Sequence, residues 1–595
     1  MDWDLSSYFP SFDGPKYRQF RDRLNEDLRI LNRAFPPEIP GTDPDLDPLI
    51  ERILGLEDAS VRRSHLSSYL GCLTAADSAH EGYAAEEAAL ALTGAAIDNA
   101  RTLILARMRL LDTSGLQKLI GDPRLADAGY ALTRLHQAAS RRMSETEEAL
   151  ASDLGVDGFE AWGRLYDNLA GNLEFEMARP DGTRERLPMS QRRSLLGHPD
   201  RRIRRAAFDG GNHAWDQVAR VAASALNSLA GTRQTLRIRR GQEHFLDPAL
   251  FDARISPPCL DALFQALKSR RESAWNMLRF RAGLMGLERI AWFDLEAPIP
   301  SPDKDAVDLS WPAACAWVQD AFDRSYPALG TFFRAVVEKQ WIDWQPRRGK
   351  RPGGFCTSSN LSGESRIFMT YNQTVNDVMT LAHEAGHAFH SHLLADKRGL
   401  IRSYPMTLAE TASTFAEQIL IEGILSDPSA PVGRKRQVLD SQVRHAVTFL
   451  LDIPIRYHFE RRFHEERQTG EVGVGRLKTL MTETQQEWLG DTLEPGGEDP
   501  LFWASKLHFF ITGLSFYNFP YTFGFLLSRK LYARLMAEGP SFLPHYEAFL
   551  RQTTVQDADA LIRNALGEDP ADPAFWAAAI DSLQEPFESL RSLDG

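Results

Sequence analysis

The sequence predicts a mainly α-helical protein with two or more lobes and little β-structure. A chain of 595 residues is longer than one hydrophobic core can organise. Apolar residues recur at helical spacing over most of the chain, whereas strand-like runs are few and short. With 43% hydrophobic and 25% charged residues, the composition is that of an ordinary soluble globular protein.

The first third of the chain is predicted to be helical. Residues 16–34 carry apolar side chains at helical spacing, and one helical pattern follows another from residue 49 to residue 169. Glycine and proline mark the breaks between these patterns. No cluster of metal-binding residue types occurs here, so we expect this part to have a structural role.

A β-hairpin and a basic helix are predicted next. The strand-like residues 173–177 and 183–187 flank a turn signal at 179–182, and a helix is expected after Ser190. This region carries arginines at positions 192, 193, 201, 202, 204 and 205. Two interpretations stay open: the cluster attracts acidic peptides or anions, or it is a solvated helix face whose arginines pair with acids.

The rest of the chain is predicted to combine long helices with two short strands. Residues 256–285 form an amphipathic helix with Pro257 in its first turn, and the best strand candidates are 290–295 and 366–371. Further helices are predicted over 376–394, after Pro405 and over 431–468 with a joint at Ile453-Pro454, and loops over 470–475 and 488–500.

The stretch LAHEAGHAFHSH, residues 381–392, contains the pattern HExxH. His383 and His387 are four residues apart, so on a helix they lie on one face and both imidazoles can reach one metal ion. Glu384 directly follows the first histidine, which turns its carboxylate to the flank of such a site. There it can take a proton from a metal-bound water instead of binding the metal. This is the zincin arrangement.

A catalytic zinc ion needs a third protein ligand and an open position for water. Glu410 is the best candidate, because it lies in a second helical pattern, TLAETASTFAEQILIEG, with Thr407 as a plausible N-cap. The intervening loop allows this helix to return antiparallel to the first, with Glu410 facing the histidines. Glu417, two turns further along, is either an acceptor that orients a ligand histidine or a solvated carboxylate.

The motif HEAGHAFH, followed by AETASTFAE, resembles the oligoendopeptidase F branch of the thimet oligopeptidase-like zinc metallopeptidases. The resemblance extends upstream to WIDWQPRRGKRPGGFCTSS and RIFMTYNQTVNDVMTLAHE, and downstream to HFFITGLSFYNFPYTFG. Near the start of the chain, Trp3-Asp4-Leu5 and Phe9-Pro10 resemble the common opening of that family. Together these segments span most of the chain.

The resemblance implies one Zn²⁺ per chain and a general base. The ligands would be His383, His387 and Glu410, and the base would be Glu384. It also implies a mainly α, two-lobed zincin-type metallopeptidase with a small β-sheet beside the zinc helix and a deep substrate channel between the lobes. Residues 1–195 would be the N-terminal helical lobe, and residues 196–595 the catalytic metallopeptidase domain.

Two further segments acquire expected roles from the resemblance. The segment HFFITGLSFYNFPYTFG resembles a substrate loop, in which His508, Tyr517 and Tyr521 steady the oxyanion and the bound peptide. Phe519 stands where that branch often has a further tyrosine, so the hydroxyl that serves the oxyanion stays open. The backbone of residues 353–357 is expected to bind extended substrate, with a plain turn as the alternative.

The expected function is zinc-dependent hydrolysis of internal peptide bonds in short unfolded oligopeptides. Two alternatives stay open. One is a zinc carboxypeptidase of the HExxH type, which needs a clamp for a free C-terminal carboxylate, and the other is a catalytically inactive peptide-binding homologue. Histidine and carboxylate ligands also suit cobalt or manganese, and zinc is preferred for its tetrahedral habit and the family resemblance.

The composition of the chain limits which partners and which cellular compartment we expect. With 68 basic and 81 acidic residues the net charge is −13, which argues against nucleic acid as a partner. The four cysteines form no CxxC pair, a pattern that suits a reducing cytoplasm. The N-terminus lacks the pattern of a secretory signal, and charged residues break the most apolar run, 88–111. We therefore expect a soluble cytoplasmic protein without membrane association.

Overall fold

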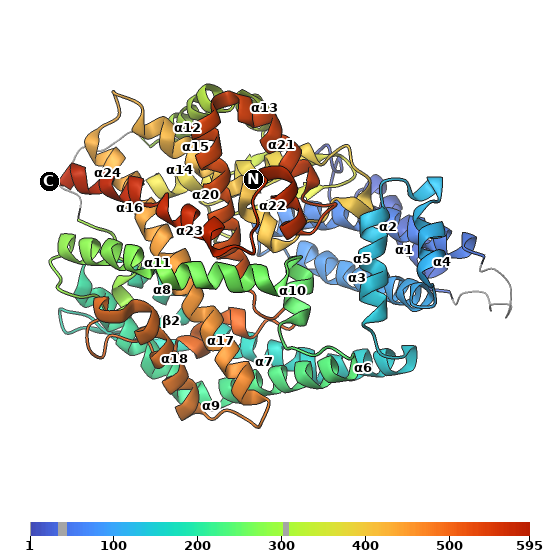
Figure 1. Ribbon diagram of the computed structural model, residues 1–595, viewed down its shortest axis with the longest axis horizontal. Coiled ribbons are helices and arrows are strands. Elements are labelled where there is room, and N and C mark those ends of the chain that lie inside the picture. The colour runs from blue at the N-terminus through green and yellow to red at the C-terminus, as the bar shows by residue number, and fades with distance from the viewer. Residues whose placement is uncertain (1, 34–44, 301–308, 595) are drawn as a thin grey trace. The chain divides into compact units, whose positions relative to one another are not determined.

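The computed structural model describes residues 2–33, 45–300 and 309–594 (Figure 1). The mainly α class is confirmed, because most of these residues are helical and their strands form one two-stranded and one three-stranded sheet. The chain groups into two compact units, each assembled from three segments. The first unit comprises 1–142, 307–430 and 531–561, and the second comprises 143–306, 431–530 and 562–595.

The domain boundary expected after residue 195 remains a prediction. Each compact unit draws residues from both sides of that position. The helices that carry the HExxH motif and Glu410 belong to the first unit, whereas His508, Tyr517 and Tyr521 belong to the second.

The first unit combines N-terminal helices with the motif helices and a small sheet. Its elements are α1 (Pro15–Leu31), α2 (Asp47–Ala76), α3 (Glu81–Met108), α4 (Thr113–Ile120), α5 (Gly129–Ser140), α12 (Trp311–Ser325), α13 (Pro327–Glu338), β3 (Ile342–Asp343), β4 (Phe355–Ser359), β5 (Glu364–Phe368), α14 (Val375–Leu393), α15 (Met406–Leu425) and α21 (Leu543–Gln552). Two helices pass from one unit to the other: α20 (Phe519–Glu538) and α22 (Ala558–Leu566).

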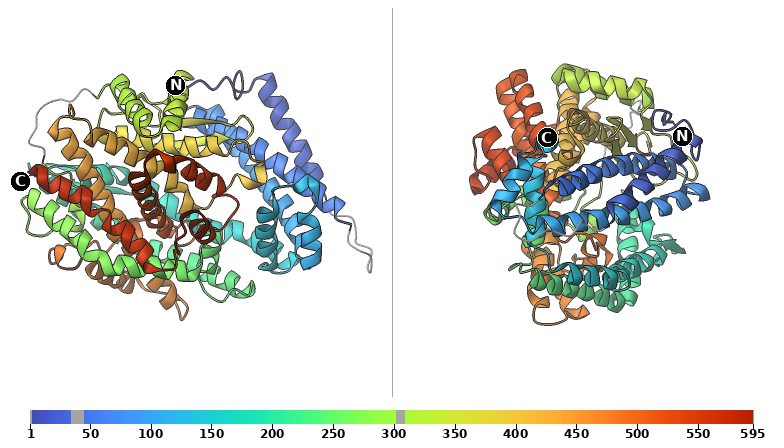
Figure 2. Two further views of the ribbon diagram at one scale, coloured as in Figure 1. Left: turned by 45° about the horizontal axis from the view of Figure 1, so that its top comes forward. Right: turned by 90° about the vertical axis from the view of Figure 1, so that its right-hand side faces the viewer.

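The N-terminal helices α1, α2 and α3 pack side by side, as the right-hand view of Figure 2 shows. The predicted helix over 16–34 is confirmed as α1, although residue 34 lies outside the described residues. Within the described ranges, α3 is the one helix long and apolar enough to cross a membrane by length and composition alone. Its residues Ala100, Ile104 and Met108 belong to the hydrophobic core of this unit, so part of its apolar surface is used in packing.

The three-stranded sheet has the order β3-β5-β4, with β3 parallel and β4 antiparallel to β5. The strand predicted over 366–371 overlaps β5, which begins and ends earlier than predicted. Gly353 adopts φ +102°, a left-handed conformation that favours glycine, and β4 begins two residues later. Gly353 therefore turns the chain into β4, a strand at the edge of the sheet. This strand lies in contact with α14.

Helix α14 begins where local chemistry favours a helix start. The hydroxyl of Thr374 accepts a hydrogen bond from the N–H of Asp377, whose carboxylate accepts one from the N–H of Thr374. Such a reciprocal capping box stabilises a helix by about 1 kcal/mol. The N-cap predicted for α15 is wrong, because that helix already begins at Met406 after Pro405, and Thr407 is a fully buried residue of its first turn.

The second unit is built around the 39-residue helix α9, which contacts α7 and α17 (Figure 1). Its elements are α6 (Glu145–Asp157), α7 (Phe159–Asn172), β1 (Glu174–Ala178), β2 (Arg184–Pro188), α8 (Arg192–Leu196), α9 (Arg201–Arg239), α10 (Asp247–Ala253), α11 (Pro257–Leu284), α16 (Val432–Val447), α17 (Ile453–Arg467), α18 (Val474–Leu489), α19 (Phe502–Ser505), α23 (Pro573–Asp581) and α24 (Gln584–Asp594). The predicted hairpin is confirmed as the antiparallel pair β1 and β2, and the predicted amphipathic helix as α11.

The strand predicted over 290–295 is wrong. Only Ile290 forms a bridge, to Leu493, and residues 292–294 are a short 3₁₀ turn. The reason is Asp294, whose fully buried carboxylate accepts hydrogen bonds from the N–H of Ala291 at 2.9 Å and from Arg204 at 2.8 Å. A buried charge requires such partners, and making them folds this segment into a turn.

The basic cluster between residues 192 and 205 is engaged with acids, as the second interpretation predicted. Arg202 pairs with Asp200 at 2.7 Å, and Arg204 with Asp294 at 2.8 Å. The interpretation is wrong in one respect, since Arg192 and Arg204 are buried instead of lying on a solvated face.

The joint predicted at Ile453-Pro454 is confirmed. Residues 448–452 form a π-helical turn between α16 and α17, and Pro454 occupies the first turn of α17. Proline lacks an N–H, so it fits where the regular bonding of the helix is already interrupted, and the π-helical turn supplies that interruption.

Candidate metal centre

Helices α14 and α15 approach each other closely at Gly386. A Cβ atom added there would lie 2.5 Å from the carbonyl oxygen of Ala412 and 2.7 Å from the Cα of Ser413. Only glycine fits this contact. His383 contacts Glu417 in the later part of α15, whereas the following His387 lies near Glu410 in its earlier part. The two helices therefore run in opposite senses, as expected.

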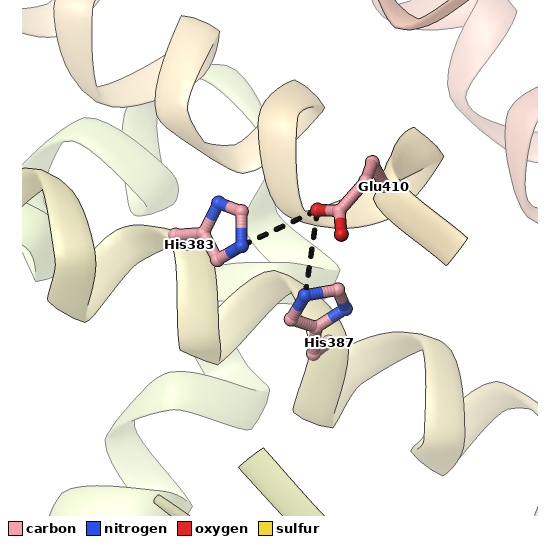
Figure 3. Close-up of side chains that lie close together, drawn as sticks. All are labelled: His383, His387 and Glu410. Atoms are coloured by element: carbon pink, nitrogen blue, oxygen red, sulfur yellow. Dashed lines mark ion pairs between the residues drawn. The ribbon is translucent and has the colours of Figure 1, made fainter. Parts of the chain in front are cut away.

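The three predicted metal ligands come together between these helices (Figure 3). The Nε2 atom of His383 lies 3.4 Å from Oε2 of Glu410, and Nε2 of His387 lies 3.6 Å from the same oxygen. Two ligand atoms at ordinary zinc distances in a tetrahedron are separated by about 3.3 Å. The three donor atoms lie within 4.8 Å of one another and are only partly buried, so the group fits a zinc-sized ion that is accessible from outside.

Glu417 orients the first of these histidines. Its carboxylate lies 2.5 Å from Nδ1 of His383, which leaves Nε2 of that imidazole directed at the site. Burial alone would lower the pKa of His383, but the hydrogen bond that it donates to Glu417 and the charges of Glu417 and Glu410 raise it to about 9. The residue is 8% exposed, so the interpretation of Glu417 as a solvated carboxylate is wrong.

The surroundings of the other two candidate ligands, His387 and Glu410, favour metal binding. Burial, followed by the charge of His383, lowers the pKa of His387 to about 4, so its imidazole is neutral and can offer an electron pair. The hydroxyl of Ser413 donates to Oε2 of Glu410 at 2.9 Å. Ser413 was not predicted as part of the site, although it stands one helical turn after Glu410 in the same motif.

Glu384 lies beside the ligands in an environment that weakens its acidity. The residue is 7% exposed, and burial together with the charges of Glu410 and Glu417 raises its pKa to about 7 despite the opposing effect of His383. The backbone N–H of Cys356 in β4 opposes this rise, because it stabilises the charged form of the carboxylate. Only the fold could reveal that contact, because the two residues come from separate elements.

The orienting role of Glu417 leads to a prediction. Replacing it with glutamine removes the negative charge opposite Nδ1 of His383, and we expect metal affinity to fall by about tenfold or more. Competition with a chromophoric chelator measures this affinity. Glu422→Gln, a change of the same kind five residues further along α15, is the control; equal affinities for both variants would contradict the role.

The predicted substrate-loop residues come together in the second unit. His508 and Tyr517 have ring centroids 4.8 Å apart, and Tyr517 and Tyr521 have centroids 5.5 Å apart. The Nδ1 atom of His508 lies 2.6 Å from Oδ1 of Asn518, a partner that the sequence analysis did not identify. Phe519 is buried against Tyr457 and belongs to the core.

Glu460 supports this loop from α17. One carboxylate oxygen accepts from the N–H of Phe516 at 2.8 Å, and within the described part of the chain the other oxygen is buried without a hydrogen-bond partner. Burial raises the pKa of Glu460 to about 7, against the opposing effects of that hydrogen bond and of Arg233. Arg233 and His464 line the same small void.

This pKa predicts a loss of stability as the pH rises. Between about pH 4.5 and pH 7 the unfolded chain releases the Glu460 proton while the folded chain keeps it. The free energy of unfolding therefore falls by roughly 3 kcal/mol over this range, relative to a chain without the group. Glu460→Gln should remove this fall, and urea midpoints of both proteins at pH 5 and pH 8 measure it. Parallel changes in the two proteins would contradict the assignment.

Comparisons with known proteins agree with this geometry. The profile of peptidase family M3 matches residues 323–580, and the profile described as oligopeptidase F matches residues 110–175. An oligoendopeptidase F homologue of Lactococcus lactis is 23% identical over 79% of this chain and 77% of the relative. The oligopeptidase PepF of Bacillus subtilis is 22% identical over 78% of this chain and 68% of the relative.

Solved structures share the fold. A peptidase from Chlamydophila abortus superimposes with a TM-score of 0.80 at 18% identity, over 99% of this chain and 98% of the other. Oligoendopeptidase F from Enterococcus faecium gives a TM-score of 0.71 at 18% identity, over 97% and 98% of the two chains. The chain belongs to peptidase family M3, in its oligoendopeptidase F branch, and is a metalloendopeptidase that acts on oligopeptides.

Proposed function

We propose that this protein is a zinc endopeptidase that cuts internal bonds of short unfolded oligopeptides, with His383, His387 and Glu410 as the zinc ligands. The observation that carries the proposal is the convergence of two imidazole nitrogens on one carboxylate oxygen at distances that suit a tetrahedral ion. Zinc is favoured over cobalt and manganese by this donor set, and a cytoplasmic location is favoured by four free cysteines.

Glu384 acts as the general base in this proposal. A zinc ion bound here supplies a Lewis acid and lowers the pKa of water. Glu384 takes a proton from the attacking water and passes it to the leaving amine. Its burial beside the carboxylates of Glu410 and Glu417 raises its affinity for that proton.

His508, Tyr517 and Tyr521 are proposed to bind the substrate and steady the oxyanion. The hydrogen bond to Oδ1 of Asn518 fixes the imidazole proton of His508 on Nδ1, so a neutral His508 presents Nε2 as an acceptor. Burial, followed by the nearby Lys506, lowers the pKa of His508 to about 4, which keeps it neutral. His508 is therefore suited to accept a peptide N–H, and a tyrosine hydroxyl is the oxyanion donor.

The two tyrosines can be distinguished by removing their hydroxyls. Tyr517→Phe or Tyr521→Phe, whichever removes the oxyanion donor, should lower kcat by about 10²-fold with little change in KM. Steady-state kinetics on one fluorogenic peptide give both constants. Tyr532→Phe, which removes a hydroxyl further along α20, is the control. If both single variants and the double variant keep full kcat, neither hydroxyl serves the oxyanion.

The test of the function is cleavage of a quenched fluorescent peptide blocked at both ends, by zinc-loaded protein, with product masses determined. Internal cleavage is expected, and an unfolded peptide should be cut while a folded protein is spared. Cleavage only after the C-terminus is freed would overturn the endopeptidase assignment in favour of a carboxypeptidase. Binding without cleavage of either peptide would indicate an inactive peptide-binding homologue.

A further inference from the structure

A cavity of about 180 Å³ in the second unit is lined by arginines and bordered by loop residues 512–515. Arg233, Arg237 and Arg240 reach it from α9, and Arg467 reaches it from the end of α17. The α9 arginines are spaced by four and three residues, so they share one face of the helix. Because the whole protein has a net charge of −13, this concentration of positive charge is a local exception.

Most of this charge has no close counter-ion. Arg240 pairs with Glu148 at 2.8 Å. Among the described residues, no carboxylate lies within ion-pair distance of Arg233, Arg237 or Arg467. Within the same residues, Nε of Arg237 is buried and has no hydrogen-bond partner. Buried donors and charges of this kind are normally satisfied, so the cavity lacks an acceptor.

The guanidinium groups are held in position by backbone carbonyls. Arg233 donates to the carbonyl of Leu514 at 2.8 Å and also to those of residues 511 and 512. Arg467 donates to the carbonyl of Asn227 at 3.1 Å and lies over Gly231, where an added Cβ would be 2.4 Å from Nη2. These contacts fix the donors without neutralising them, which is the condition for a preorganised anion site.

The walls of the cavity supply little compensating charge at neutral pH. Phe159 packs against Arg233, and Phe245 stacks on His464 with centroids 5.6 Å apart. Burial and then the charges of three surrounding arginines lower the pKa of His464 to about 3, so this imidazole is neutral. Asp252 is the one acidic residue among the described residues that line the cavity.

We propose that this cavity binds a small anion through phosphate or carboxylate oxygens, and that the bound anion stabilises the loop that carries His508 and Tyr517. Guanidinium groups bind both kinds of oxyanion with charge-assisted hydrogen bonds. Arg233 donates to the loop carbonyls and also lines the cavity. A bound anion therefore orders the loop, and an ordered loop in turn favours binding of the anion. The anion site and its effect on the loop do not depend on the proposed function. Only the role of that loop in peptide hydrolysis rests on it.

Calorimetric titration of the full chain with inorganic phosphate and, separately, with succinate at constant ionic strength tests the site. Saturable binding of at least one anion is expected, and the tighter one identifies the chemistry of the natural ligand. Arg237→Gln and Arg467→Gln should each weaken binding about tenfold or more, since each removes charge-assisted hydrogen bonds. Arg239→Gln is the control, because Arg239 is an exposed residue of the same helix.

Circular dichroism of each variant verifies that it folds, and the second arginine variant keeps the test valid if the first does not. No saturable binding of either anion would overturn the site. Binding that is equal in wild type and in all variants would overturn its location, as expected if the anion bound at the metal centre instead.

Hydrogen exchange tests the coupling to the loop without relying on peptidase activity. Backbone amides of residues 510–518 should exchange more slowly with phosphate in wild type and in Arg239→Gln, but not in Arg237→Gln. Binding that leaves this exchange unchanged would overturn the coupling. Failure of the proposed function would be seen separately: the protein would not hydrolyse peptides although it still bound the anion.

Discussion

Replacing Glu384 with glutamine is expected to lower peptide turnover by about 10³-fold or more while metal content stays at one ion per chain. The amide cannot take a proton from water, and general base catalysis contributes about 10²–10⁴-fold to such reactions. The structure predicts that the site itself survives. Glutamine has the same shape and still offers an oxygen to the N–H of Cys356, and the ligands His383, His387 and Glu410 are unchanged.

The measurement pairs kcat on a fluorogenic peptide with metal analysis of the same preparation. Glu422→Gln, a substitution of the same kind on α15, should keep both activity and metal. A Glu384→Gln protein that turns over at the wild-type rate would remove Glu384 from the mechanism. Loss of metal together with activity would mean that Glu384 helps to hold the ion.

Replacing Gly386 with alanine should damage both the fold and the metal site. The new methyl group would meet backbone atoms of Ala412 and Ser413 at 2.5 and 2.7 Å, and backbone cannot move aside as a flexible side chain can. We expect the free energy of unfolding to fall by about 2 kcal/mol or more, even though alanine favours helix by about 1 kcal/mol. Separation of α14 from α15 should also weaken metal binding, because the ligands sit on both helices.

Gly71→Ala provides the matched control, since Gly71 lies in helix α2 of the same unit and has open space where a Cβ would go. That change should be neutral or stabilising by up to about 1 kcal/mol. Thermal unfolding with and without added zinc compares the two variants. Equal stability and equal metal affinity for Gly386→Ala and wild type would contradict the close contact.

The sequence was sufficient to predict which residues meet at the candidate metal centre, because the information is local. HExxH on a helix fixes the relation of His383 to His387 within one turn, and helical periodicity with a capping residue identifies α14. Glu410 could be found because only one connecting loop separates it from the motif. The Cys356 N–H and the fit of Gly386 against α15 could not be predicted, since each depends on which elements meet in space.

The errors in the predicted fold also arise from contacts between elements that are distant in the sequence. Residues 290–295 have a strand-like composition, but Asp294 must satisfy arginines that come from α9, and this requirement overrides local propensity. Thr407 is a good N-cap by residue type, yet it is fully buried inside α15. The arginine cavity was also missed, because Arg467 follows Arg237 by more than two hundred residues and no sequence pattern joins them.

The composition of the first unit from three distant segments has a consequence for biosynthesis. His390 of the motif helix bonds through Nε2 to the carbonyl of Leu550 and to the hydroxyl of Thr553, and α14 packs on α21. On a ribosome that adds about 5–20 residues per second, this support emerges roughly ten to thirty seconds after the HExxH motif. The motif helix is therefore synthesised well before the partners that bury His390, and its packing in a nascent chain is completed only near the end of synthesis.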